Sequence, residues 1–214
     1  ELADFNPFIQ YLVSEGIAVA APNVRGSTGY GKTYTHLDDV EKRLDSVKDI
    51  GSLVSYLVGE GIADKDRMAV TGMSYGGFMT LSCATRLPEL WCCAIDTVGM
   101  YNLETFLENT AEYRRAHRES EYGSLARHRH ILREVSPSAK IDDIQAPLMV
   151  IQGRNDPRVP AEEAEQVVGT LRERGHVVEY LCYEDEGHGI GKLKNQLDCY
   201  PRMAAFLKKY MKLS

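Results

Sequence analysis

Short apolar runs alternate with longer amphipathic stretches along almost the whole chain, and this alternation restricts the fold more than any other feature of the sequence. Each apolar run is strand-sized and lies between turn residues, which favours a buried strand over a helix. Such strands are expected at Ile17–Ala21, Arg67–Thr71, Cys93–Val98, Pro147–Gln152 and Val177–Tyr183.

The stretches between these runs repeat their apolar residues with the period of a helix. Helices are expected at Phe8–Ser14, Asp45–Leu57, Tyr75–Arg86, Glu162–Arg174 and Leu197–Lys212. Strands that alternate with helices of this length form a mostly parallel sheet with helices on both faces, so the predicted fold class is α/β. The segment 100–145 is long for a connection and rich in charge, and we expect it to contain helices that border a functional site.

The composition fits one globular domain and argues against two classes of function. Hydrophobic residues make up 43% of the 214, enough for a substantial core. Lys and Arg number 25 against 31 Asp and Glu, and this net charge of −6 lacks the basic excess of a nucleic-acid binder. The locally basic segment Arg114–Arg133 is interpreted as a solvated helical face, with a charged-ligand site as the alternative. No apolar run approaches the roughly 18 residues of a transmembrane helix, so no membrane partner is expected.

The five cysteines indicate a reducing compartment. They lie in apolar segments, their number is odd and no Cys-x-x-Cys pair occurs. This pattern favours free thiols in the cytoplasm over a disulfide framework. The sequence implies no metal site and no cofactor.

The segment Gly72-Met73-Ser74-Tyr75-Gly76-Gly77 lies between a predicted strand and a predicted helix. A G-x-S-x-G pattern in this context is typical of a nucleophile elbow, a sharp turn that lifts the serine hydroxyl off the sheet edge. Side chains two residues before and after the serine would collide, so glycine is expected at both Gly72 and Gly76. The N–H of Tyr75, at the start of the helix, can stabilise an oxyanion. The alternative is an ordinary structural turn.

A serine needs a base and an acid that orients it, and both are expected past the ends of strands. His188 lies on a Gly-flanked loop after the last predicted strand, and Asp156 follows the strand before it. Asp96, which also ends a strand, is the alternative acid. The order Ser74, Asp156, His188 is that of an α/β-hydrolase. We therefore expect the Ser74 hydroxyl within hydrogen-bond reach of His188 Nε2, with Asp156 facing Nδ1.

Four segments carry a resemblance to a known family. They are Asn23–Gly31 (NVRGSTGYG), Gly72–Gly77 (GMSYGG), Gly153–Pro160 (GRNDPRVP) and Asp185–Gly189 (DEGHG). In order and spacing the chain resembles the catalytic domain of the prolyl oligopeptidase family of serine peptidases, and it looks most like bacterial dipeptidyl- and acylaminoacyl-peptidase-like members. The resemblance implies an α/β-hydrolase fold over residues 1–214 and hydrolysis of short peptides or acyl-peptides. It also implies that Ser74 is the nucleophile, Asp156 the acid, His188 the base and Tyr75 one oxyanion donor.

The resemblance further implies a set of substrate-binding residues. Arg158, two residues after the acid, matches an arginine that in some members binds a substrate backbone carbonyl. The alternative is a surface arginine paired with Glu162 or Glu163. The pocket for the residue before the cleaved bond would be lined by Val159, Tyr75, Val98 and Tyr101.

The chain also departs from the family pattern. Many members carry Trp where this chain has Met73. The second oxyanion donor and the substrate-filtering β-propeller of the family lie upstream of anything in this sequence. We therefore expect Glu1 not to be the natural start, and a strand between Ile17–Ala21 and the nucleophile strand to come from upstream sequence, with a β-propeller further upstream. An oligomer is compatible with the sequence.

Three other functions compete with the peptidase. A carboxylesterase acting on small acyl esters would use the same residues. A non-catalytic α/β-hydrolase relative would act as a binding module, although such proteins usually lose a triad member. A nucleotide-binding domain would rest on the loop Gly26–Gly31, but its G-x-x-G-x-G spacing and the lack of a prompt helix favour a loop near the active-site rim.

Overall fold

One parallel sheet forms the centre of the molecule. The computed structural model describes residues 5–213. Within them the sheet has four strands in the order β1-β2-β3-β4, and every neighbouring pair is parallel. The strands are β1 (Ala69–Met73), β2 (Cys93–Thr97), β3 (Leu148–Gly153) and β4 (Val178–Tyr183). Each lies within two residues of a predicted strand, and the parallel α/β class is confirmed.

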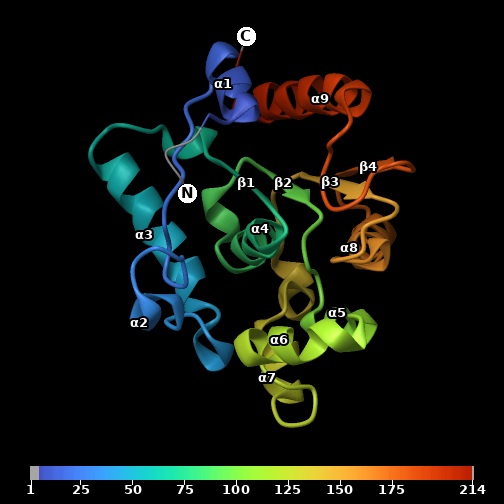
Figure 1. The fold of residues 1–214 in the computed structure, drawn as a ribbon. Coiled ribbons are helices and arrows are strands. Elements are labelled where there is room, and N and C mark those ends of the chain that lie inside the picture. Colours follow the sequence, from blue (N-terminus) through green and yellow to red (C-terminus); the bar gives the residue numbers. More distant parts are fainter. Residues whose placement is uncertain (1–4, 214) are drawn as a thin grey trace.

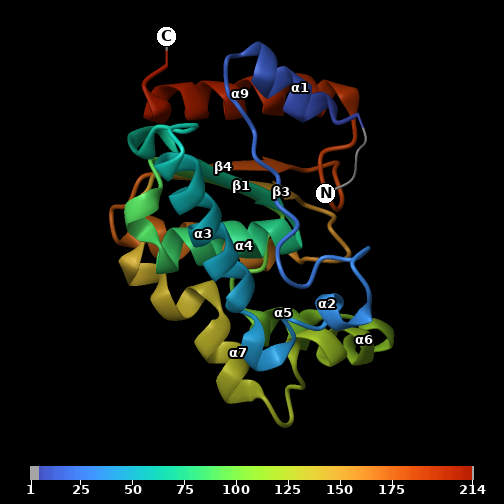
Figure 2. The same ribbon diagram turned by 90° about the vertical axis from the view of Figure 1, so that its left-hand side faces the viewer.

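Helices cover both faces of this sheet (Figures 1 and 2). α1 (Pro7–Ser14) and α9 (Leu193–Met211) lie on one face, where Ile95 and Ile151 point into their shared apolar cluster. α4 (Tyr75–Arg86) and α8 (Ala161–Glu173) lie on the other, and α3 (Asp45–Gly59) packs beside α4. Because β3 has a strand on each side and helices on both faces, all of its residues are buried, which explains its continuous apolar run.

The segment 100–145 contains the helices α5 (Leu103–Asn109), α6 (Glu112–Tyr122), α7 (Arg129–Val135) and η4 (Pro137–Asp143). α5, α6 and α7 lie on the side of α4 that faces away from the sheet (Figures 1 and 2), whereas η4 packs beside α4 and joins the apolar cluster shared by α4, α8 and the sheet. The remaining short helices are α2 (Lys32–Thr35), η1 (Val40–Lys42), η2 (Lys65–Arg67) and η3 (Pro88–Leu90).

The strand expected at Ile17–Ala21 is not present, and that prediction was wrong. The segment belongs to no strand, and of its five residues only Ile17 is buried, against the α1 and α9 cluster. A strand needs a neighbour that takes up its N–H and C=O groups. Among the described residues β1 pairs with β2 alone, so the Ile17–Ala21 segment does not add to the free edge of β1 and has no ladder to join.

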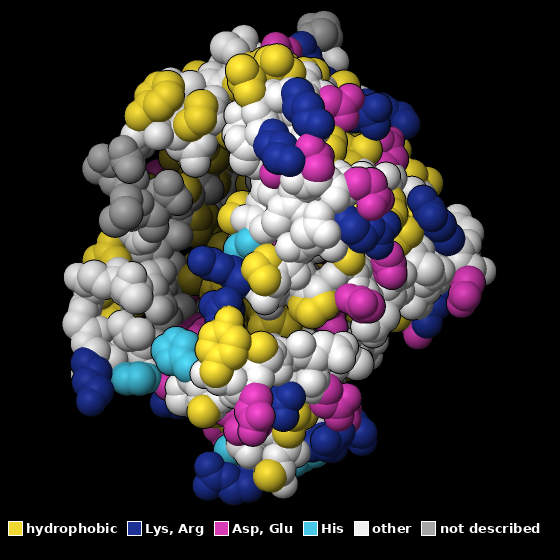
Figure 3. Space-filling model, turned by 45° about the vertical axis from the view of Figure 1, so that its right-hand side comes forward, with side chains coloured by type: hydrophobic (Ala, Val, Ile, Leu, Met, Phe, Trp, Pro, Cys, Tyr) yellow, Lys and Arg dark blue, Asp and Glu magenta, His cyan; other side chains and the backbone are white. Residues whose placement is uncertain are grey.

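Two further observations bear on the predicted partners. No helix within residues 5–213 is both long enough and apolar enough to cross a bilayer. On the face shown in Figure 3, basic and acidic side chains are interspersed, and they form no broad basic surface. The expectation about Glu1 lies outside the described residues.

Candidate active site

Ser74 occupies the sharp turn between β1 and α4. Its backbone has φ 60° and ψ −114°, a left-handed conformation that is uncommon for any residue other than glycine. The turn is held by two backbone hydrogen bonds: the Ser74 N–H donates to the carbonyl of Thr97 at 2.9 Å, and the Phe78 N–H donates to the carbonyl of Ser74 at 3.0 Å. These two bonds hold the strained backbone of Ser74 in place, one to β2 and the other within the first turn of α4.

Close backbone approaches around this turn explain two of its glycines. A Cβ atom on Gly72 would lie 2.3 Å from the carbonyl oxygen of Gly76, and one on Gly77 would lie 2.3 Å from Oδ1 of Asp96. A Cβ on Gly76 would meet no atom within 4 Å beyond its own helical turn. The prediction that Gly76 is required was therefore wrong, because the tight contacts fall on Gly72 and Gly77 instead.

The structure brings Ser74, His188 and Asp156 together from three separate loops. His188 Nε2 lies 2.9 Å from Ser74 Oγ, and His188 Nδ1 lies 2.7 Å from Asp156 Oδ2. The Asp156 side chain is fully buried, and its other oxygen accepts hydrogen bonds from the N–H groups of Arg158 and Val159 at 2.7 and 3.0 Å. These bonds fix the carboxylate, which in turn fixes the imidazole with Nε2 toward the serine.

The loops that carry Asp156 and His188 pack tightly together. They follow the neighbouring strands β3 and β4, whose ends meet at one edge of the sheet. The Asn155 N–H donates to the carbonyl of Glu186 at 2.9 Å. A Cβ on Gly153 would lie 2.1 Å from the carbonyl oxygen of Gly187, so only glycine allows this approach.

Glu186 supports the histidine loop, a role that the sequence reading missed. It is 5% exposed, and its carboxylate accepts hydrogen bonds from the N–H groups of Gly191 and Lys192 and from the side-chain amide of Asn195. Burial raises the pKa of Glu186, but the hydrogen bonds from Asn195, Lys192 and Gly191 outweigh it and hold the pKa below its usual range. The loop thus folds around the ionised carboxylate of Glu186, two residues before His188. In the sequence, the only sign of this role is that an acidic residue stands next to Gly187.

Comparison with known proteins gives this geometry a family. A model described as the prolyl oligopeptidase family matches residues 3–214. The chain belongs to this family. It is 35% identical over 211 residues to dipeptidyl peptidase family member 6 of Caenorhabditis elegans. This alignment covers 96% of the present chain and 28% of the relative. It is also 34% identical over 200 residues to dipeptidyl aminopeptidase BIII of Pseudoxanthomonas mexicana. This second alignment covers 89% of the present chain and 28% of the relative.

A solved structure agrees with this assignment. The crystal structure of puromycin hydrolase matches with a TM-score of 0.91 and 25% identity, and the match covers 97% of this chain and 31% of that chain. The predicted α/β-hydrolase fold and the predicted family are confirmed. The chain spans about 28% of the length of the curated relatives it matches, so most of each relative has no counterpart in it.

The Arg158 side chain is exposed, and its backbone N–H donates to the carboxylate of Asp156. Within residues 5–213 its guanidinium forms no ion pair, so the alternative of a pair with Glu162 or Glu163 does not describe this structure. Glu163 is instead buried and accepts hydrogen bonds from the N–H groups of Tyr101 and Asn102. The Arg158 side chain therefore remains available to a ligand.

The residues expected to line the substrate pocket divide into two groups. Val159 is buried one residue after Arg158 and joins the same apolar cluster as the ring of Tyr75. Val98 is buried where β2 ends and has a left-handed φ of 46°. Tyr101 packs in the core between η4 and α8, and its phenol contacts Thr170 near the end of α8 that is far from Asp156. The structure thus joins Val159 and Tyr75 in one apolar cluster and places the Tyr101 side chain in another.

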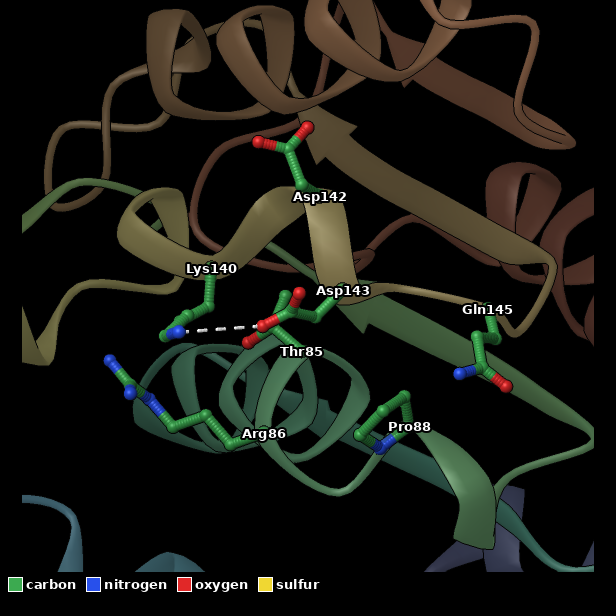
Figure 4. Close-up of a pocket in the computed structure, with 7 residues that line it drawn as sticks. All are labelled: Thr85, Arg86, Pro88, Lys140, Asp142, Asp143 and Gln145. Carbon is green, nitrogen blue, oxygen red and sulfur yellow. Dashed lines mark ion pairs between the residues drawn. The ribbon is translucent and has the colours of Figure 1, made fainter.

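Two cavities lie at opposite ends of α4. One of about 370 Å³ adjoins the candidate site and is lined by Met73, Glu186, Gly187, His188, Gly189, Ile190 and Gly191. Another of about 450 Å³ lies at the C-terminal end of α4 and is drawn in Figure 4 with Thr85, Arg86, Pro88, Lys140, Asp142, Asp143 and Gln145. There Lys140 and Asp143 form an ion pair at 3.6 Å. A twelve-residue helix is about 18 Å long, so this second cavity is remote from Ser74.

Proposed function

We propose that this chain carries the catalytic machinery of a serine peptidase that hydrolyses peptide bonds of short peptides through an acyl-enzyme. The observation that carries the proposal is the continuous hydrogen-bonded path from Ser74 Oγ through His188 to the buried carboxylate of Asp156. Family membership and the dipeptidyl peptidases among the relatives support peptides as the substrate.

Each residue of the path has a role in this mechanism. Ser74 attacks the scissile carbonyl while His188 Nε2 takes the hydroxyl proton and then passes it to the leaving amine. Asp156 holds the imidazole in the tautomer with the proton on Nδ1 and stabilises the imidazolium that forms. The N–H of Tyr75, the first residue of α4, has no carbonyl one turn earlier to bind and donates to the developing oxyanion. Water then repeats the sequence on the acyl-enzyme and releases the acid.

The substrate contacts follow from the position of Arg158. In the proposal its free guanidinium donates to a backbone carbonyl of the peptide, a contact that a small acyl ester cannot provide. Val159, Val98 and the ring of Tyr75 form the wall of the pocket for the residue before the cleaved bond. The helical segment 100–145 borders this pocket. The proposal leaves Tyr101 out of this wall, because its side chain packs in the core against residues of η4 and α8.

The proposal extends to the whole protein. Within the described residues one edge of β1 carries no neighbouring strand, and the relatives are more than three times as long as the chain. We therefore place residues 1–214 in the α/β-hydrolase catalytic domain of a longer polypeptide, in which upstream sequence supplies a strand beside β1 and a β-propeller. The five cysteines are free, in keeping with a cytoplasmic protein.

Labelling of the full-length protein with a fluorophosphonate tests this proposal. We expect one adduct, on Ser74, and none in Ser74→Ala, while Ser52→Ala on α3 labels like the wild type. Absence of an adduct on Ser74 in folded protein would contradict catalysis and favour a binding module. Comparison of kcat/KM on an aminoacyl p-nitroanilide and on p-nitrophenyl acetate separates the peptidase from a carboxylesterase, which would turn over the ester alone.

A further inference from the structure

The phenol of Tyr75 ends in a closed polar cluster beside the nucleophile turn. Its hydroxyl donates to Asp38 Oδ2 at 2.6 Å, and Arg43 donates to the same oxygen at 2.6 Å. Ser46 Oγ lies 3.2 Å from the Tyr75 hydroxyl. Asp38 is 4% exposed and Arg43 is not exposed at all. The residue that follows Ser74 is thus held at both ends, by the turn at its backbone and by a buried ion pair at its ring.

The cluster is built from segments far from Ser74 in sequence. Asp38 precedes η1 and Arg43 follows it. A Cβ on Gly26 would lie 2.2 Å from Asp38 Oδ1, so the glycine-rich loop lies directly against this carboxylate. On its other side Arg43 stacks on the ring of Tyr122 in α6, with its guanidinium carbon 4.6 Å from the ring centre. These contacts join the glycine-rich loop and α6 to the nucleophile turn.

The protonation states in this cluster suit a fixed donor. Burial raises the pKa of Tyr75 to about 12, although the charge of Arg43 opposes the shift, so the phenol keeps its proton and donates it to Asp38. Burial lowers the pKa of Arg43, but the nearby groups Tyr75, Asp38, Tyr122 and Glu121 outweigh it and raise the pKa overall. A buried ion pair is weak evidence for stability, because desolvation of the charges offsets their attraction. Its geometric effect is to direct the hydroxyl of Tyr75 to one place.

We propose that Asp38 and Arg43 are positioning residues that hold Tyr75 so that its backbone N–H points at the oxyanion. This inference rests on the proposed peptidase function. An oxyanion donor must lie about 2.7–3.1 Å from the developing charge, so a small rotation of the peptide plane before Tyr75 weakens the contact. A shift of the Tyr75 Cα that turns this plane would also move the Tyr75 ring away from Asp38, and the buried hydrogen bond opposes that movement.

The variant Tyr75→Phe in the full-length protein tests the proposal. It removes the hydroxyl but keeps the ring and leaves the ion pair of Asp38 and Arg43 intact. We expect kcat on an aminoacyl p-nitroanilide to fall by about 10–100-fold, less than the loss of a whole oxyanion donor, with KM changed by less than about threefold. Tyr122→Phe is the matched control, because it removes the hydroxyl of the other tyrosine whose ring Arg43 contacts, outside the nucleophile turn, and it should keep wild-type kcat.

Two inhibitors distinguish positioning from general damage. A peptide boronate that forms a tetrahedral adduct should lose affinity for Tyr75→Phe in proportion to kcat, whereas the product peptide should bind as it does to the wild type. Asp38→Asn should add no further loss of kcat in the Tyr75→Phe background, because Asp38 bonds to Tyr75 only through the hydroxyl that Tyr75→Phe has already removed.

The outcomes separate this inference from the proposed function. Failure of the wild type to label or turn over substrate would overturn the peptidase assignment itself. An active wild type with unchanged kcat in Tyr75→Phe would overturn only the positioning role. Equal losses of affinity for the boronate and for the product peptide would also overturn it, since they would indicate a deformed pocket.

Discussion

A buried carboxyl under the nucleophile turn should make the stability of this domain depend on pH. Asp96 lies near the end of β2, opposite Gly72 of β1, and is 1% exposed. Its Oδ1 packs against the backbone of Gly77 and Gly99, and among the described residues neither carboxyl oxygen has a hydrogen bond of regular geometry, although the Gly99 N–H lies near. Burial raises the pKa of Asp96 to about 7, Glu163 adds to the shift and the Gly99 N–H opposes it.

The size of the effect follows from the two pKa values. An unfolded chain releases this proton near pH 3.8, whereas the folded protein keeps it until about pH 7. Between these values the folded state binds one proton more than the unfolded state, so the free energy of unfolding falls as pH rises. At about 1.4 kcal/mol per pKa unit, a difference of about three units amounts to about 4 kcal/mol. Below pH 3.8 the contribution is fully present, and above pH 7 it has been lost.

Replacement of the carboxyl by an amide should remove this dependence. We expect the difference in unfolding free energy between Asp96→Asn and the wild type to shift by about 4 kcal/mol in favour of the variant between pH 4 and pH 8. The measurement is denaturant unfolding of the catalytic domain in the full-length protein at several pH values, with the exposed Glu60→Gln as the control. Parallel curves for the wild type and Asp96→Asn would refute the reasoning, because they would mean that Asp96 ionises at the same pH in both states.

Two other predictions use matched positions. Gly77→Ala should destabilise the domain by several kcal/mol, because its Cβ would press on Asp96 Oδ1 and Gly99 Cα. Gly76→Ala, whose Cβ meets no such atom, should change the melting temperature little. Equal losses of stability in the two variants would contradict this reasoning. Arg158→Ala should reduce kcat/KM on peptide p-nitroanilides by about tenfold or more and leave p-nitrophenyl acetate nearly unaffected, since a hydrogen bond to a charged group is worth about 1.5–3 kcal/mol. Arg154→Ala removes an exposed arginine of the same loop and should affect neither substrate.

The features that the sequence predicted well are those encoded over a short span. The helix expected at Tyr75–Arg86 has those bounds in the structure, because the turn at Ser74 and the proline at Pro88 mark its two ends locally. His188 and Asp156 could be found because each follows a recognisable strand. Parallel strands place such loops at one edge of the sheet, so three local signals were enough to predict one long-range arrangement.

The features that the sequence did not predict depend on contacts between distant segments. Asp38 and Arg43 lie in a charged, irregular stretch where nothing distinguishes a buried ion pair from a solvated one. The sequence suggested Asp96 only as an alternative acid, but His188 pairs with Asp156, and Asp96 Oδ1 packs against Gly77 and Gly99. Burial of a charged side chain depends on what the rest of the chain places over it, and a local pattern does not contain that information.

The segment Ile17–Ala21 also shows that a local pattern does not determine long-range contacts, here by predicting a strand that does not form. Its composition is that of a buried strand, and the pattern was interpreted as one. An apolar pattern of this kind indicates that a segment can form a strand. The strand forms only where a second strand with free N–H and C=O groups lies within reach. Here β1 is the nearest strand of the sheet in sequence, and the two do not pair. The unpaired edge of β1 and this unpaired apolar run are both in keeping with the proposal that upstream sequence supplies a strand between them.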